Sequence, residues 1–264
     1  MLSLGRPRRA APTVVSNLRP SWLCYKVSKD EEAVELYRWI RFRGCLAVVG
    51  FQEQLKHVYW IGGGSGAGKS TIARRIAAQH GLRVYSTDDV MAEHARRCSP
   101  EDCPLLHKFM EMGMDERWVK RSPETMLETF HWFQGEGFNL IIEDLLSLPR
   151  ERGVIVEGFR LLPQLVSPLL SESSHAVWLL PAPDFRQAVV NSRGGQAWGF
   201  VARTTDPERA LRNLLERDRI FTDILREQTA RLGLRAIEID TTTTEVDLIK
   251  RVTDLFAIAT HPAV

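Results

Sequence analysis

The chain has 264 residues, 44% of them apolar, and a formal net charge of +2 from 35 Lys and Arg against 33 Asp and Glu. This length allows one or two domains with a sizeable core. The near-neutral charge argues against a nucleic-acid partner, and no apolar run is long enough to span a membrane. Four cysteines without paired spacing favour a reducing compartment, so we expect a cytoplasmic protein.

Residues 1–56 are interpreted as an N-terminal extension. Up to Lys29 there are six Lys and Arg, no acidic residue and no apolar signal-peptide core. This pattern indicates a basic tail, with an organelle transit peptide as the alternative. A helical pattern follows at 30–44, and the apolar run CLAVVGF at 45–51 is read as an extra strand.

From residue 57 to residue 264 we expect the main domain, because short apolar runs alternate there with amphipathic segments. This alternation is typical of an α/β protein with a parallel sheet. The expected strands are HVYWI (57–61), LRVYST (82–87), GVIVEGF (153–159), HAVWLLPAP (175–183) and RAIEID (235–240). The expected helices cover 69–81, 122–134 with Ser122 as N-cap and Pro123 at the first position, 206–233 and 245–256.

The stretch WIGGGSGAGKS (60–70) joins the first expected strand to the first helix and fits the pattern G-x-x-x-x-G-K-[ST]. Its glycines free the backbone so that successive N–H groups converge on phosphate oxygens. Lys69 adds positive charge, and the Ser70 hydroxyl is placed to bind Mg²⁺. The alternative is a chance glycine-rich turn. The predicted nucleotide-binding residues are Gly63, Gly64, Ser65, Gly66, Ala67, Gly68, Lys69, Ser70 and Thr71.

Acidic residues follow the second and third expected strands, at the sheet edge where parallel α/β proteins bind ligands. Asp88 and Asp89 are candidate substrate ligands, and either could accept a proton from an acceptor hydroxyl. Capping of the next helix is the alternative role and suits Asp89, so Asp88 is the preferred base. Glu157 is expected to help Ser70 hold Mg²⁺, with a surface glutamate as the alternative. Arg160 is expected to hold the acceptor, with a solvated arginine as the alternative.

The segment 191–219 combines glycines with arginines, which is typical of a lid that closes over phosphates; a plain surface loop is the alternative. Within it, Arg203 and Arg217 are candidate catalytic residues, together with Arg219, and Arg217 is also a candidate for binding the acceptor. Exposed ion pairs along a helix would explain Arg217 and Arg219 equally well.

Residues 98–138 form a long connection that we expect to cover the acceptor and to decide specificity. Four residues in and before it could bind zinc. Their spacing is wide for a single zinc knuckle, so lining of the acceptor pocket is the preferred interpretation. These residues are His94, Cys98, Cys103 and His107.

These features resemble the superfamily of nucleoside-monophosphate, shikimate and gluconate kinases over about residues 57–258. VIVEGFR is similar to the acidic-Gly-Phe-Pro-Arg strand of nucleotide kinases, with Glu in place of Asp and without the Pro. LLERDRIF resembles a shikimate-kinase stretch, which implies that Arg217 binds the acceptor. STDD resembles the acidic edge of adenylylsulfate kinases and chloramphenicol phosphotransferase, which implies that Asp88 is the base.

The resemblance implies the P-loop NTPase fold: a five-stranded parallel sheet in the order 2-3-1-4-5 with helices on both faces. It also implies ATP and Mg²⁺ as cofactors and a small-molecule phosphoryl acceptor as partner. We therefore expect a kinase that moves the γ-phosphate to a hydroxyl of a nucleoside, sugar or antibiotic-like molecule. The alternatives are a polynucleotide or tRNA kinase, a zeta-like toxin kinase and a P-loop ATPase without an acceptor. Homodimer formation is left open.

Overall fold

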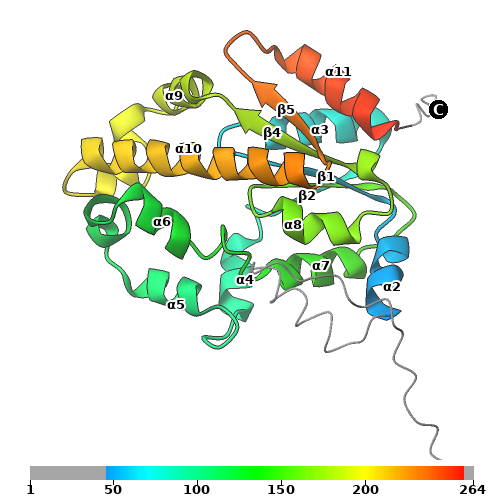
Figure 1. The fold of residues 1–264 in the computed structure, drawn as a ribbon, viewed down its shortest axis with the longest axis horizontal. Helices are drawn as coiled ribbons and strands as arrows, with labels where there is room; N and C mark the ends of the chain where they lie inside the picture. The colour runs from blue at the N-terminus through cyan, green and yellow to red at the C-terminus, as the bar shows by residue number, and fades with distance from the viewer. Residues whose placement is uncertain (1–45, 259–264) are drawn as a thin grey trace, which may run out of the picture. The chain divides into compact units, whose positions relative to one another are not determined.

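The computed structural model describes residues 46–258, so the basic tail and the helix expected at 30–44 lie outside the described residues. The described residues form an α/β unit around a five-stranded sheet (Figure 1). All strands are parallel and their order is β2-β3-β1-β4-β5, which confirms the predicted fold class and strand order. The strands are β1 (Val58–Gly63), β2 (Arg83–Ser86), β3 (Val154–Glu157), β4 (Ala176–Pro181) and β5 (Arg235–Ile239).

The central strands are continuous apolar runs because helices cover both faces of the sheet. In the parallel register, Val58 of β1 lies opposite Val154 of β3, and Trp60 of β1 lies opposite Ala176 of β4. This register brings the carboxyl ends of β1, β3 and β4 to one edge. The residues that follow these strands are therefore close together in space.

One face of the sheet is covered by α3 (Lys69–His80) and α11 (Glu245–Phe256), which lie on the same side of the strands in Figure 1. Their buried side chains, including Ile72, Ile76 and Val252, form one core cluster with the strand residues that point to this side. Gly81 ends α3 in the left-handed conformation, as the sequence pattern predicts.

The other face is covered by α2 (Leu46–Gln54), α7 (Phe138–Ser147), α8 (Pro163–Val166) and the long α10 (Pro207–Arg231). The strand predicted at 45–51 is wrong, because its described residues belong to α2. A short apolar run is compatible with either a strand or a buried helix. Phe51 of this helix and Leu55, the residue directly after it, are both buried. Both belong to the large core cluster, so the core begins before residue 57, where the sequence prediction placed the domain boundary.

The connection between β2 and β3 contains four short helices before α7. Ser122 caps α6 as predicted, since its hydroxyl accepts a hydrogen bond from the Thr125 amide. The helix ends at Thr129 rather than at Gln134. In the turn that follows, the Phe133 ring stacks on Phe221 of α10, and the Trp132 ring lies against Arg160, which follows β3. The short helices are α4 (Met91–Arg97), α5 (Pro104–Glu111), the π-helix η1 (Glu116–Lys120) and α6 (Pro123–Thr129).

The elements after β3 include several single turns besides α9 (Pro183–Ser192). The 3₁₀ turns are η2 (Ser167–Leu169), η3 (Ser173–His175), η4 (Gly195–Ala197) and η5 (Val201–Arg203). Among the helices of the described chain, none is both long and apolar enough to cross a bilayer.

Candidate functional site

The glycine-rich loop joins β1, the central strand, to α3. Gly66 has a left-handed φ of +78°, and a Cβ there would come within 3.1 Å of the Arg186 guanidinium. Glycine is therefore needed for both the turn and the close approach. Gly68 precedes α3 without a side-chain cap, so the first N–H groups of this helix face the loop and are suited to an anion.

Lys69 lies at the first position of α3 and is only 7% exposed. Its Nζ donates a hydrogen bond to the Gly64 carbonyl at 2.7 Å. Burial lowers the pKa of Lys69, and the nearby carboxylates of Asp88 and Glu157 oppose this shift. The lysine predicted to bind phosphate therefore lies close to both acidic residues predicted for the same site.

Glu157 at the end of β3 is completely buried, and neither carboxylate oxygen has a hydrogen-bond partner among the described residues. The hydroxyl of the neighbouring Thr87 is also buried and unpartnered. The chain after β3 touches the chain after β2 at Gly158, which has a φ of +149°. A Cβ on this residue would lie 1.7 Å from the Thr87 hydroxyl, so only glycine allows the contact. The surface glutamate considered as an alternative is excluded, because the Glu157 side chain is fully buried. A buried carboxyl group requires a compensating partner.

Asp88 and Asp89 lie in the turn between β2 and α4. The Asp88 side chain is accessible to solvent. The protein around its carboxyl group nevertheless removes enough water to raise its pKa, and the charges of Lys69 and Arg160 oppose this shift. Asp89 is exposed and does not have the capping role considered as its alternative, because α4 begins at Met91 and Val90 occupies the N-cap position. Asp88 is thus the residue of the pair that lies beside the buried charges.

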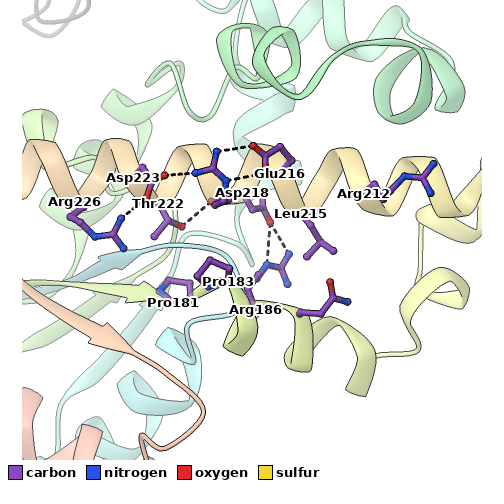
Figure 2. A pocket seen from close by; sticks show the side chains of 12 residues that line it. Pro181, Pro183, Arg186, Arg212, Leu215, Glu216, Asp218, Thr222, Asp223 and Arg226 are labelled. Carbon is purple, nitrogen blue, oxygen red and sulfur yellow. Dashed lines mark hydrogen bonds and ion pairs between the residues drawn. The ribbon is translucent and has the colours of Figure 1, made fainter.

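Three charged residues on α9 and α10 form a buried group that the sequence predicts only in part. The Asp218 carboxylate accepts hydrogen bonds from Arg217 through Oδ1, at 2.6 and 3.1 Å, and from Arg186 through Oδ2, at 2.7 and 3.3 Å. Figure 2 shows Arg186 reaching from α9 to Asp218 on α10. Both arginines keep one buried Nη1 atom without a partner among the described residues.

Arg217 also faces aromatic rings from the connection before β3. Its guanidinium carbon lies 4.9 Å from the Phe130 ring centre, 5.0 Å from that of Phe133 and 5.5 Å from that of Trp118. The exposed helix pair considered as an alternative does not describe Arg217, which is buried. Part of the predicted acceptor cover, residues 118–133, therefore lies against the predicted acceptor arginine.

Arg219 fits the alternative interpretation instead. It is exposed and pairs with Glu216 and Asp223 along the surface of α10. Arg203 is exposed at the end of η5. The second half of the predicted lid, from residue 207 onward, is part of the rigid helix α10, so only the segment between α9 and α10 has the irregular backbone of a lid.

Arg160 is neither solvated nor in contact with a carboxylate in the described residues. It is 2% exposed, donates hydrogen bonds to backbone carbonyls and to His94, and lies 4.0 Å from the centre of the Trp132 ring. Burial lowers its pKa to about 10, so it remains charged at neutral pH. The predicted direct contact with the acceptor is not available while Arg160 keeps these partners.

The residues considered for zinc binding have other partners. Both ring nitrogens of His94 are taken by Arg160 and Asp144. The His107 ring bonds to the Cys98 carbonyl. Burial raises the pKa of the Cys98 thiol, which disfavours the thiolate that zinc binding requires. The structure therefore does not assemble these residues as a metal site.

A cavity of about 260 Å³ lies between α9 and α10, beside the glycine-rich loop (Figure 2). Pro181, Arg186, Asp218 and Thr222 are among its lining residues, and Pro181 and Thr222 also pack against Gly64 of the loop. Arg186 is not among the site residues predicted from the sequence. The signal that indicates it is its position: Arg186 follows β4, the neighbour of β1, at the edge where ligands bind.

The comparisons with known proteins add one relative. No protein-family model matches the chain. The chain is similar to the 2-phosphoglycerate kinase of Methanococcus maripaludis (strain C6), with 27% identity over 218 aligned positions. The alignment covers 75% of this chain and 66% of the relative, just under two thirds of its length. The similarity supports an enzyme of the general kinase kind and does not extend to the substrate.

Proposed function

We propose that this protein is an ATP-dependent phosphotransferase that moves the γ-phosphate to a hydroxyl of a small, negatively charged molecule. The observation that carries the proposal is a set of buried side-chain atoms without hydrogen-bond partners among the described residues: both oxygens of Glu157, and one nitrogen each of Arg186 and Arg217. Buried polar atoms without hydrogen-bond partners are costly, so these atoms are suited to a ligand that brings a cation to Glu157 and anionic oxygens to the two arginines. Membership of the kinase superfamily that the motifs resemble is part of this proposal.

On the donor side, the N–H groups at the start of α3 and the Lys69 ammonium would bind the β- and γ-phosphates of ATP. Lys69 now donates to the Gly64 carbonyl and would exchange this partner for phosphate. Arg186 lies against Gly66 and would neutralise charge on the transferring group.

Mg²⁺ fits the oxygen groups at the same edge. Hard divalent cations prefer oxygen ligands, and the unpartnered Glu157 carboxylate and the Ser70 hydroxyl provide them. When bound, the ion would neutralise charge on the ATP phosphates. This role also explains why the fully buried Glu157 carboxylate has no hydrogen-bond donor among the described residues.

On the acceptor side, Asp88 would take the proton from the acceptor hydroxyl as that oxygen bonds to the γ-phosphorus. The bond between the γ-phosphorus and the bridging oxygen breaks, and ADP leaves. Arg217 is suited to bind an anionic acceptor, because it is buried, faces three aromatic rings and has one nitrogen without a partner among the described residues. The relative's name refers to 2-phosphoglycerate, a phosphorylated hydroxy acid, which is therefore the first acceptor to test.

The test is a transfer assay with radiolabelled γ-phosphate on ATP and a panel of acceptors: 2-phosphoglycerate, other hydroxy acids, uncharged sugars and nucleosides. We expect label in a product of an anionic acceptor and little in the uncharged compounds. Release of labelled phosphate at the same rate with every compound would identify an ATPase and refute the proposal. Transfer to uncharged compounds alone would refute the anionic acceptor and leave the kinase assignment in place.

A further inference from the structure

Behind the candidate site, three side chains from different elements form a connected chain of hydrogen bonds. His94 on α4 is completely buried. Its Nε2 lies 2.8 Å from an Asp144 oxygen on α7, and its Nδ1 lies 3.0 Å from Nη1 of Arg160, which follows β3. This chain of side chains links α4 and α7 to the residues that follow β3, and Arg97 of α4 adds a second link to α7 through Asp144.

The partners determine which nitrogen of His94 carries the proton. A guanidinium can only donate, so Nδ1 must accept from Arg160. The proton is therefore on Nε2 and is donated to Asp144, which accepts as a carboxylate. Burial alone would raise the pKa of Asp144, but hydrogen bonds from Tyr85, His94 and Arg97 outweigh it and lower the pKa, so Asp144 stays ionised.

The other end of the chain reaches the turn that carries Asp88. Arg160 donates to the Gly137 carbonyl at 3.1 Å and, at the limit of 3.5 Å, to the carbonyl of Thr87, the residue before Asp88. Since these acceptors and the His94 ring are neutral, no direct partner among the described residues neutralises the positive charge of Arg160. Its field therefore acts on the nearby carboxylate of Asp88.

We propose that His94 is a positioning residue for the candidate base: held by Asp144, it accepts from Arg160 and fixes that guanidinium beside the Asp88 turn. The inference rests on the proposed function for its catalytic meaning, because it takes Asp88 as the general base. Arg160 acts on Asp88 by its charge, and His94 determines where that charge lies.

The arrangement predicts a loss of function on acidification. Burial lowers the pKa of His94, with Arg160 acting in the same direction and Asp144 against it, so the ring is neutral at pH 7. Below that pKa the added proton would occupy Nδ1, remove the acceptor for Arg160 and place two positive charges side by side. The charged and titratable groups that face or surround this ring are Asp144, Arg160, Tyr85, Glu93 and Arg97.

Two variants of nearly equal size separate positioning from packing. His94→Asn keeps an oxygen near the place of Nδ1 and does not titrate, whereas His94→Leu offers no acceptor. Both variants lose the imidazole ring, so the main difference between them is that His94→Asn can still accept a hydrogen bond from Arg160 and His94→Leu cannot. Arg97→Gln is a control, because it removes an outer partner of Asp144 and leaves the bonds of His94 in place.

The direct readout is the Asp88 carboxyl titration, followed by ¹³C NMR on the ligand-free full chain and assigned with Asp88→Asn. We expect the pKa of Asp88 to rise by about 0.5 unit or more in His94→Leu, because the opposite charge is no longer held in place. It should stay near the wild-type value in His94→Asn and Arg97→Gln. The same titration in His94→Leu as in the wild type would overturn the inference.

A second measurement, of the protonation of the two His94 ring nitrogens, uses the wild-type protein and therefore does not depend on the folding of a variant. In ¹⁵N NMR of histidine-labelled wild type at neutral pH, His94 should show a protonated Nε2 and an unprotonated Nδ1, and a proton on Nδ1 would overturn the inference.

In the transfer assay with 2-phosphoglycerate, the acid limb of kcat should move to higher pH in His94→Leu only. Absence of transfer by the wild type would count against the proposed function, while the two NMR measurements would still decide the role of His94.

Discussion

Replacing Asp218 by Asn tests the buried group that joins α9 to α10. The amide has the size of the carboxylate but carries no charge. It offers one accepting oxygen, and its NH₂ group would face the second guanidinium. Arg186 and Arg217 would therefore remain buried without a compensating charge, and one of them would face a donor.

The expected loss of stability can be worked from the geometry. Asp218 is 2% exposed and accepts four hydrogen bonds from the two arginines. Removing one partner from a buried ionic group costs about 3–5 kcal/mol. For a chain of this size, each kcal/mol corresponds to about 2–4 °C in Tm, so we expect a decrease of roughly 6–20 °C.

The assay is urea unfolding followed by circular dichroism, with Asp223→Asn as the matched control on the same helix. Asp223 is exposed and pairs with Arg219 and Arg226 at the surface, so its loss should cost less than about 1 kcal/mol. Interaction with the two arginines holds the pKa of Asp218 below its usual value despite burial. The stabilisation is therefore present above about pH 4, the unfolded pKa, and is lost as the pH falls through the lower folded value.

The difference between wild type and Asp218→Asn should thus be large at pH 7 and shrink below about pH 4. Equal unfolding free energies for Asp218→Asn and Asp223→Asn at pH 7 would refute the reasoning. A large difference that does not change with acidification would show that the carboxylate charge is not its source.

Further predictions concern turnover in the transfer assay. Arg217→Lys should lower kcat because a lysine cannot reproduce the planar, bidentate group, whereas Arg219→Lys should not change it; equal kcat values for the two variants would remove Arg217 from the site. Asp88→Asn should lower turnover by about 10²-fold or more with ATP affinity retained, and the same loss in Asp89→Asn alone would reverse the choice of base. Glu157→Gln should raise the Mg²⁺ concentration needed for half-maximal turnover, measured by magnesium titration, and an unchanged titration would exclude Glu157 as a ligand.

The sequence predicts the fold well because its signals are local. Each strand is a short apolar run, and helix ends carry clear signals, such as the N-cap Ser122 of α6 and Gly81 after α3. The run at 45–51 fails because periodicity over so few residues does not separate a strand from a buried helix. Only the packing of Phe51 and Leu55 into the core decides between them.

The site is predicted less completely because its residues meet through tertiary contacts. The glycine-rich loop and the acidic edge follow from spacing and strand ends, which are properties of the sequence. The bridge from Asp218 to Arg186 joins two helices that are separate in the chain, and no local pattern indicates it. The same holds for Arg160, whose burial against Trp132 and His94 depends on the packing of α4 and α7.

The most direct test of the central claim compares Lys69→Ala with Lys56→Ala. Lys69 lies buried in the proposed phosphate site, whereas Lys56 is an exposed lysine that pairs with Glu53 just before β1. The measurement is Mg²⁺-dependent transfer of labelled γ-phosphate from ATP to the acceptor identified in the panel. The account predicts that Lys69→Ala loses about 10² or more of the transfer rate while staying folded, and that Lys56→Ala transfers at the wild-type rate. Near-wild-type transfer by a folded Lys69→Ala protein would contradict the account.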